Sequence, residues 1–200
     1  LLAHASGLAD PNATGWVHPP GRAVRPPALL TRATFARHAR LRSPPGARAR
    51  YTNLGYLVLG ELLAQREGGY EAAAADVLAR AAAHGASVAP AGAARGHEAL
   101  ASARTLVMAA LFGRRTPGLV AYVRDGWVGL TPFELEGQAY GGLVGSIDDL
   151  VAVGRALLVP GRVLDASTLA MMRAPAARGP DGAYGLGPYL CGDGWVGHGG

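Results

Sequence analysis

The sequence predicts a globular α+β protein, on three observations. Half of its 200 residues are hydrophobic and 16% are charged, so the chain can bury a sizeable core. Several stretches carry apolar side chains at helical spacing, whereas short apolar runs between glycines near the C-terminus are typical of strands. Glycine and proline are frequent, at 30 and 14 residues, yet stay below the level that marks a low-complexity chain.

The first 50 residues are rich in proline-containing loops, and most of the expected helices follow them. Asn53 can cap a largely apolar helix, and Gly85 lies where the next helix ends. Ser146 with Asp149 forms a capping box at the start of a later helix. The expected helical ranges are 31–40, 53–65, 70–83, 98–112, 146–159 and 167–173.

Strands are expected in two regions. Residues 118–130 alternate enough to predict one strand. Residues 184–190 and 194–198 read as two strands around a turn at Gly192 and Asp193. The chain is therefore expected to be mainly helical, with few strands.

The composition excludes several classes of function. The net charge is +5, but the basic residues are all arginines scattered among proline and alanine, so we expect a solvated surface and no nucleic-acid partner. Cys191 is the only cysteine, which rules out an intrachain disulfide, and we interpret it as a small buried side chain rather than a nucleophile. The histidines lack metal-binding spacing, so neither a metal nor another cofactor is expected. Membrane association, oligomeric state and localisation are not indicated.

Tyr51 and Asn53 are the first candidate site residues. They lie two apart just before a helix, and in extended backbone such residues face the same way, so the phenol and the amide can enter one cavity. As a general base near pH 7, a tyrosine needs nearby cations that favour its phenolate. Taken alone, the pair is weak evidence for a site and favours a second interpretation, a core tyrosine beside an asparagine helix cap.

Five segments in a fixed order favour the first interpretation of this pair, a phenol and an amide in one cavity. They are Leu1–Leu8, Pro44–Gly46 with Tyr51–Tyr56, Gly141–Leu150, Tyr184–Gly187 and His198–Gly200. This order resembles the serine β-lactamase-related family, which includes class C β-lactamases, D-alanyl-D-alanine carboxypeptidases and esterases. The resemblance implies a β-lactamase/transpeptidase-like fold, an antiparallel sheet packed with helices plus a helical subdomain. These 200 residues would cover mainly the helical part and one or two strands.

The resemblance also implies roles for individual residues. Tyr51 would be a catalytic proton shuttle beside Asn53, and His198 would provide a hydrogen bond or positive charge near the phenol. Gly199 and Gly200 would bind substrate along a strand edge, where backbone amides stabilise an oxyanion. His4 would be a hydrogen-bonded scaffold residue. The family's nucleophile is the serine of a Ser-x-x-Lys motif.

The chain departs from the family pattern at the nucleophile, because it contains no lysine and therefore no Ser-x-x-Lys. We expect that motif upstream of Leu1 and the closing strands beyond Gly200, so that residues 1–200 form a partial domain that is inactive alone.

The function implied for the whole protein is a serine hydrolase that acts through a covalent acyl-enzyme on an ester or a D-amino-acid peptide or amide. His198 in place of the family's lysine favours a peptidase or esterase over antibiotic resistance. The partner would be a small-molecule or peptide substrate. Two alternatives remain open: an inactive member that keeps the cavity for binding or regulation, and an unrelated helical scaffold with Tyr51 and His198 far apart.

Overall fold

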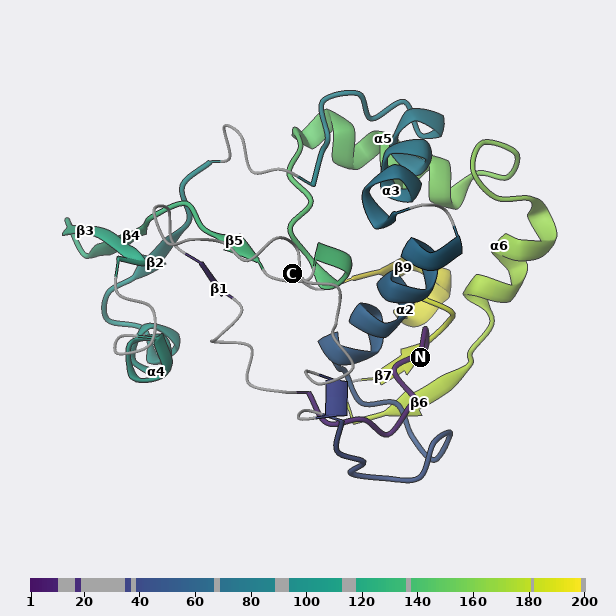
Figure 1. The fold of residues 1–200 in the computed structure, drawn as a ribbon, viewed down its shortest axis with the longest axis horizontal. Helices are drawn as coiled ribbons and strands as arrows, with labels where there is room; N and C mark the ends of the chain where they lie inside the picture. The colour runs from purple at the N-terminus through teal and green to yellow at the C-terminus, as the bar shows by residue number, and fades with distance from the viewer. Residues whose placement is uncertain are drawn as a thin grey trace. The chain divides into compact units, whose positions relative to one another are not determined.

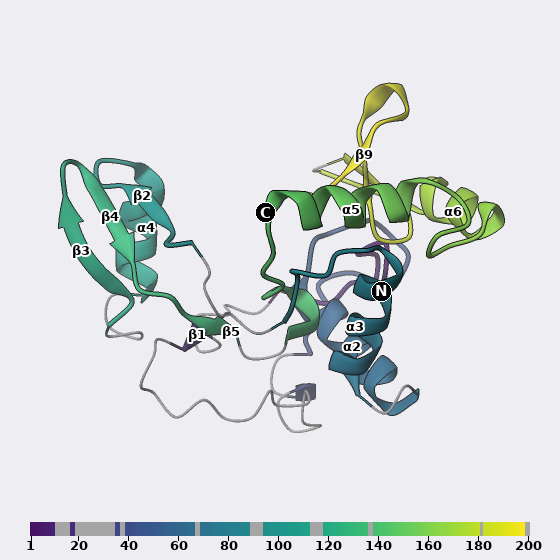
Figure 2. The same cartoon turned by 90° about the horizontal axis from the view of Figure 1, so that it is seen from above.

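The computed structural model describes residues 1–10, 17–18, 35–36, 39–66, 69–88, 94–112, 118–135, 138–180 and 182–198. The chain forms two compact units, drawn as ribbons in Figures 1 and 2. Unit 1 contains Leu1–Pro11, Leu30–Ala86 and Gly145–Gly200, and unit 2 contains Asn12–Leu29 and Ser87–Val144. Unit 1 contains all of the site residues predicted from the sequence.

The helices of unit 1 whose bounds the structure describes are α2 (Asn53–Arg66), α3 (Tyr70–Arg80), α5 (Ile147–Leu158) and α6 (Ala166–Arg173). Helices α3 and α5 lie side by side (Figures 1 and 2) and share a core built from Leu78, Ala81, Ala83 and Ala156. Ala81 and Ala83 belong to the turn after α3, so the end of this helix and the turn that follows it pack on Ala156 of α5.

The sheet of unit 1 is antiparallel and has the order β6-β7-β8-β9. Its strands are β6 (Ala177–Gly179), β7 (Gly182–Tyr184), β8 (Tyr189–Leu190) and β9 (Val196–Gly197), with a 3-10 turn, η3 (Gly192–Gly194), before the last. A second core cluster of Ala3, Ala49 and Tyr184 joins the N-terminal segment to this sheet. The Ala49 N–H also donates to the Arg178 carbonyl at 2.7 Å, which places the chain entering α2 along the edge of β6.

Unit 2 contains a three-stranded antiparallel sheet of order β2-β4-β3. The strands are β2 (His97–Ala99), β3 (Val120–Arg124) and β4 (Trp127–Leu130), and helix α4 (Ala103–Phe112) follows β2 in the chain. A separate pair, β1 (Val17–His18) with β5 (Glu134–Leu135), and the short η2 (Gln138–Tyr140) complete the unit.

Several predicted helices are confirmed. Helix α2 covers the expected 53–65, α6 covers 167–173, and α5 begins after Ser146 with the predicted capping box to Asp149. Helix α3 ends at Arg80 rather than at 83, since Ala82 adopts a left-handed conformation with φ of 61°. The expected cap at Asn53 is wrong: Asn53 is the first helical residue, and its N–H is bound by Asp10.

The strands differ more from expectation. The predicted strand 118–130 is a hairpin, because Asp125 and Gly126 both have positive φ and form a tight turn between β3 and β4. The predicted helix 98–112 begins only at Ala103, since 97–99 pair with β4. The described residues of unit 1 form a sheet of four short strands rather than one or two, with 184–190 divided between β7 and β8.

Cys191, interpreted from the sequence as a small buried side chain, is exposed. The expected helix 31–40 lies mostly outside the described residues; within them, 35–36 are helical and 39–40 are not. None of the helices in the described ranges is both long enough and apolar enough to span a bilayer.

Candidate active site

The N-terminal segment folds against the chain that enters α2. His4 has a left-handed backbone with φ of 53°, a conformation that costs energy in most non-glycine residues and is more frequent in histidine than in most. Its carbonyl accepts the Arg50 N–H at 2.9 Å, and its ring Nδ1 accepts the Thr52 N–H at 3.2 Å. His4 therefore accepts hydrogen bonds from the backbone amides of Arg50 and Thr52, just before helix α2.

The His4 ring lies among three tyrosines. Its side chain is 1% exposed, and its centroid is 4.5 Å from that of Tyr51 and 5.0 Å from those of Tyr56 and Tyr184. The Tyr56 hydroxyl donates to the Leu2 carbonyl at 3.1 Å, which closes the cluster against the N-terminal segment. The buried position and the Thr52 bond fit the scaffold role expected for His4.

His4 is held neutral. Burial, with smaller contributions from His198 and the N-terminal ammonium, lowers the pKa of His4 from 6.5 to about 4. Because Nδ1 accepts the Thr52 N–H, the ring proton sits on Nε2, a buried atom without a hydrogen-bond partner in the described structure. The imidazole is thus a neutral support for the tyrosine beside it.

The structure brings together the three predicted catalytic side chains. The Tyr51 hydroxyl donates to Asn53 Oδ1 at 3.1 Å, so the two side chains lie on the same side of the chain, as expected for residues two apart. The rings of Tyr51 and His198 have centroids 6.0 Å apart at an interplanar angle of 57°, with His198 directly after β9. A phenol, an amide and an imidazole therefore meet at the N-terminus of α2. Gly199 and Gly200 lie outside the described residues.

Tyr51 is a neutral phenol in this environment. Burial raises the pKa of Tyr51 above its usual 10, and the charges of Asp10 and Tyr184 raise it further. Ionisation near pH 7 would require a cation placed next to the phenol. The hydroxyl as it stands can donate a proton or relay one.

Asp10 is a site residue that the sequence analysis did not select. Its Oδ1 accepts the Asn53 backbone N–H at 2.6 Å, and its Oδ2 accepts from Asn53 Nδ2 at 3.4 Å. Burial raises the pKa of Asp10, while the hydrogen bonds from Asn53 and Thr52 act in the opposite direction. Two features of the sequence could have indicated it: Asp10 is the only acid among the first 50 residues, and it follows the motif Leu1–Leu8 closely.

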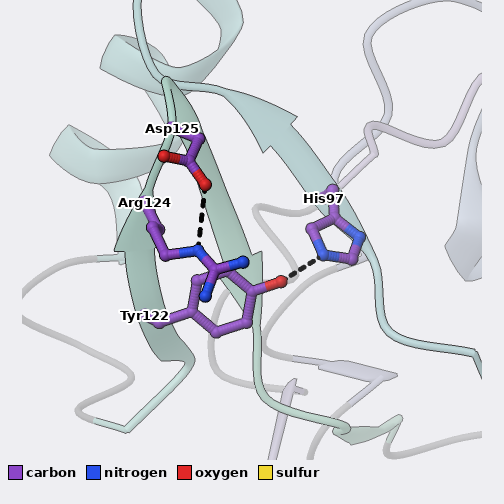
Figure 3. A network of polar contacts seen from close by, with 4 residues as sticks. All are labelled: His97, Tyr122, Arg124 and Asp125. Atoms are coloured by element: carbon purple, nitrogen blue, oxygen red, sulfur yellow. Dashed lines mark hydrogen bonds and ion pairs between the residues drawn. The ribbon is translucent and has the colours of Figure 1, made fainter.

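A second cluster of polar side chains lies in unit 2. Figure 3 shows the Tyr122 hydroxyl directed at the His97 ring, with Oη 2.5 Å from Nε2, and Arg124 bound to Asp125 at 2.9 Å. These side chains are exposed. No group of three His, Cys, Asp or Glu side chains that could hold a metal ion occurs among the residues that the structure describes.

The sequence and the fold define the family of the chain. Residues 1–200 match the profile of the Beta-lactamase family, and the chain belongs to that family. The β-lactamase/transpeptidase-like fold and the resemblance drawn from the five segments are both confirmed. No curated protein matches the sequence.

Solved structures with the same fold include three hydrolase relatives of low identity. D-amino acid amidase from Ochrobactrum anthropi SV3, complexed with D-phenylalanine, has a TM-score of 0.70 at 22% identity and matches 98% of this chain and 56% of its own. Penicillin binding protein from Bacillus halodurans has a TM-score of 0.60 at 24% identity, over 98% of this chain and 56% of its own. D-stereospecific amidohydrolase from Streptomyces sp. has a TM-score of 0.61 at 19% identity, over 98% of this chain and 57% of its own. The chain thus spans little more than half the length of these structures.

Proposed function

We propose that the protein is a serine hydrolase in which Tyr51, Asn53 and His198 form one side of an acyl-transfer site. The observation that carries this proposal is that the three side chains lie together at the N-terminus of α2. Asn53, the nearer of the other two in sequence, is 145 positions from His198. Membership of the Beta-lactamase family supports it.

The nucleophile of the proposed reaction is a serine from outside these 200 residues. A Ser-x-x-Lys cannot lie within them, because they contain no lysine. The serine oxygen would bond to the substrate carbonyl carbon as its proton passes toward Tyr51. The bond to the leaving alcohol or amine would then break, with a proton returned to the leaving group. Water would attack the resulting acyl-enzyme, releasing the acid and restoring the serine.

Tyr51 would exchange protons in both directions during this cycle. As a neutral phenol it can protonate a leaving group, and it can accept a proton from the serine if it releases its own or is ionised by a nearby ammonium. The missing lysine would provide such a cation. His198, whose ring lies 6.0 Å from that of Tyr51, would hold the substrate or stabilise charge that develops beside the phenol.

The proposed substrate is an ester, or a peptide or amide of a D-amino acid. The amidase that shares the fold was crystallised with D-phenylalanine and with L-phenylalanine amide, both small amino-acid derivatives. The histidine at position 198, where the family's lysine is expected, favours a peptidase or esterase over a β-lactam-hydrolysing enzyme.

The test uses the full-length protein with a p-nitrophenyl ester, D-phenylalanine amide and a fluorophosphonate probe. We expect turnover of at least one substrate, and a single probe adduct that mass spectrometry locates on a serine outside residues 1–200. Residues 1–200 expressed alone should give no adduct.

Two outcomes would overturn the proposal. An adduct on a side chain within residues 1–200 would place the nucleophile elsewhere. A folded full-length protein that binds D-phenylalanine but neither turns over nor labels would indicate the alternative, a catalytically inactive binding or regulatory member.

A further inference from the structure

We propose that Asp10 is a positioning residue of this site, which sets the orientation of the Asn53 amide and, through it, the direction in which Tyr51 donates its proton. The effect of Asp10 on catalysis rests on the proposed function, whereas the effect of Asp10 on Tyr51 does not. The basis is a continuous path of hydrogen bonds from a carboxylate through an amide to a phenol.

The two oxygens of Asp10 bind different parts of Asn53. Oδ1 accepts the backbone N–H, the first amide of helix α2, at 2.6 Å. Oδ2 lies 3.4 Å from the side-chain Nδ2. An ionised carboxylate can only accept hydrogen bonds, so the end of the Asn53 amide that faces Asp10 has to be its NH2 group. The carbonyl end is then the one that faces Tyr51.

This orientation determines the direction of the Tyr51 hydrogen bond. Asn53 Oδ1 can only accept, so the phenol donates to it at 3.1 Å, and the lone pairs of the phenol oxygen remain available to an incoming donor. If the amide were reversed, its NH2 group would donate to the phenol, and the Tyr51 proton would point elsewhere. A proton relay needs one of these two directions, and Asp10 selects it.

The two residues that precede Asp10 are fixed by contacts with other parts of the chain. The preceding Ala9 N–H donates to the Arg40 carbonyl at 2.7 Å, and the Ala9 carbonyl lies 3.4 Å from the Thr52 hydroxyl that donates to it. Leu8 forms an antiparallel bridge with Leu41. The carboxylate is therefore anchored against the start of α2, on a backbone that leaves it little freedom to turn away.

Asp10 also acts on Tyr51 through its charge. A negative charge nearby disfavours the phenolate, and Asp10 accordingly raises the pKa of Tyr51. Other titratable groups face this phenol as well: His4, Tyr56, Tyr184 and His198. All of them are unchanged in a variant at position 10, so the variant isolates the effect of Asp10.

The chain contains a matched control for this position. Asp165 also binds the start of a helix, as the N-cap residue of α6, and accepts the Thr168 N–H at 2.7 Å and the Ser167 hydroxyl at 2.7 Å. It is not among the groups that shift the pKa of Tyr51. The same Asp→Asn change at both positions removes one charge from a helix cap, but only at position 10 does the carboxylate hold Asn53.

The experiment follows the ionisation of Tyr51 by NMR in full-length protein labelled at tyrosine Cζ with ¹³C, and Tyr51→Phe identifies its signal. Asp10→Asn keeps the size of the side chain and an acceptor oxygen for the Asn53 N–H, so it should fold. We expect its Tyr51 midpoint to move to lower pH, because a charge is lost and the Asn53 amide is no longer held. Asp165→Asn should leave the midpoint in place. Asp10→Ser, a second neutral cap, should reproduce the shift if Asp10→Asn folds poorly.

An unchanged Tyr51 midpoint in folded Asp10→Asn and Asp10→Ser would overturn the proposal and reduce Asp10 to a helix cap. Kinetics form a separate arm: Asp10→Asn should lower kcat about 10- to 100-fold with little change in KM, the effect of a misdirected catalytic group. If the wild-type protein hydrolyses no ester or amide, the proposed function fails, while the NMR titration still decides the role of Asp10.

Discussion

The residues that the structure describes contain two histidine–tyrosine clusters of nearly the same ring geometry, one in each unit. In unit 2 the His97 and Tyr122 rings have centroids 5.9 Å apart, and in unit 1 the His198 and Tyr51 rings have centroids 6.0 Å apart, both at an interplanar angle of 57°. His97 and Tyr122 are exposed, while the Tyr51 ring packs on a His4 side chain that is only 1% exposed. Proximity of a base to a phenol therefore does not by itself define a site.

The two contacts also have different structural origins. His97 and Tyr122 are both register partners of Gly129 on the central strand β4, and a Cβ at Gly129 would lie 2.5 Å from the Tyr122 ring. The glycine lets the ring cross the central strand, so the contact in unit 2 follows from sheet register (Figure 3). In unit 1, the neighbouring Asn53 amide and the buried His4 imidazole from the N-terminal segment contact Tyr51, and the distant Asp10 carboxylate binds Asn53.

The largest expected difference between the clusters is in catalysis. Tyr51→Phe in the full-length protein should raise the activation barrier by about 2–4 kcal/mol, or roughly 30- to 1000-fold in kcat/KM, because a proton-transfer group is lost. Tyr122→Phe removes the same hydroxyl from the exposed cluster and should leave kcat/KM unchanged. The measurement is hydrolysis of a p-nitrophenyl ester. Wild-type turnover by Tyr51→Phe would remove Tyr51 from the mechanism.

The next largest difference concerns stability in acid. Unfolded histidine takes up a proton near pH 6.5, but the pKa of His4 in the folded protein is about 4. Since the unfolded state then binds more protons, the free energy of unfolding falls as the pH drops from 6.5 through 4 and levels off below, by on the order of 3 kcal/mol. Urea unfolding of the full-length protein across this range measures the loss.

Two variants isolate the contribution of His4 to that loss. His4→Asn provides a neutral acceptor for the Thr52 N–H, so it should be less stable at pH 7 through poorer packing but should lose less stability on acidification. His97→Gln should keep the wild-type pH dependence. Equal acid sensitivity in wild type and His4→Asn would show that His4 is not the titrating group.

The sequence predicted the elements whose signals are local, and it missed those that depend on distant partners. The capping box of Ser146 and Asp149 lies within four residues and was recognised, as was the Tyr51–Asn53 pair. Asp10 acts on a residue 43 positions away, so no local pattern could assign it as the cap of α2 in place of Asn53. The hairpin within 118–130 was also not predicted, although its turn signal, Asp125-Gly126, is local and can be read from the sequence.

The hydrogen bond between His97 and Tyr122 in unit 2 can be broken without substituting either residue. Gly129→Ala would place a Cβ where the Tyr122 ring lies, and the exposed ring should swing away from His97. Alanine is also better tolerated than glycine in a strand, so the free energy of unfolding should change by no more than about 1 kcal/mol. Loss of the nuclear Overhauser contact between the His97 and Tyr122 rings, with amide protection of β4 retained, is the expected NMR result. Persistence of the contact would mean that the backbone, rather than the ring, moves.

The smallest effect is expected from His97 itself. His97→Gln exchanges an exposed hydrogen bond for one with water, and substitutions at such positions change stability by less than about 0.5 kcal/mol. Thermal unfolding of His97→Gln beside Tyr122→Phe measures this, since both variants remove the same bond from opposite ends. A loss above about 1 kcal/mol in both would show that the pair joins β2 to β3 across Gly129. In that case the exposed cluster would stabilise the sheet of unit 2, as His4 supports the entry to α2 in unit 1.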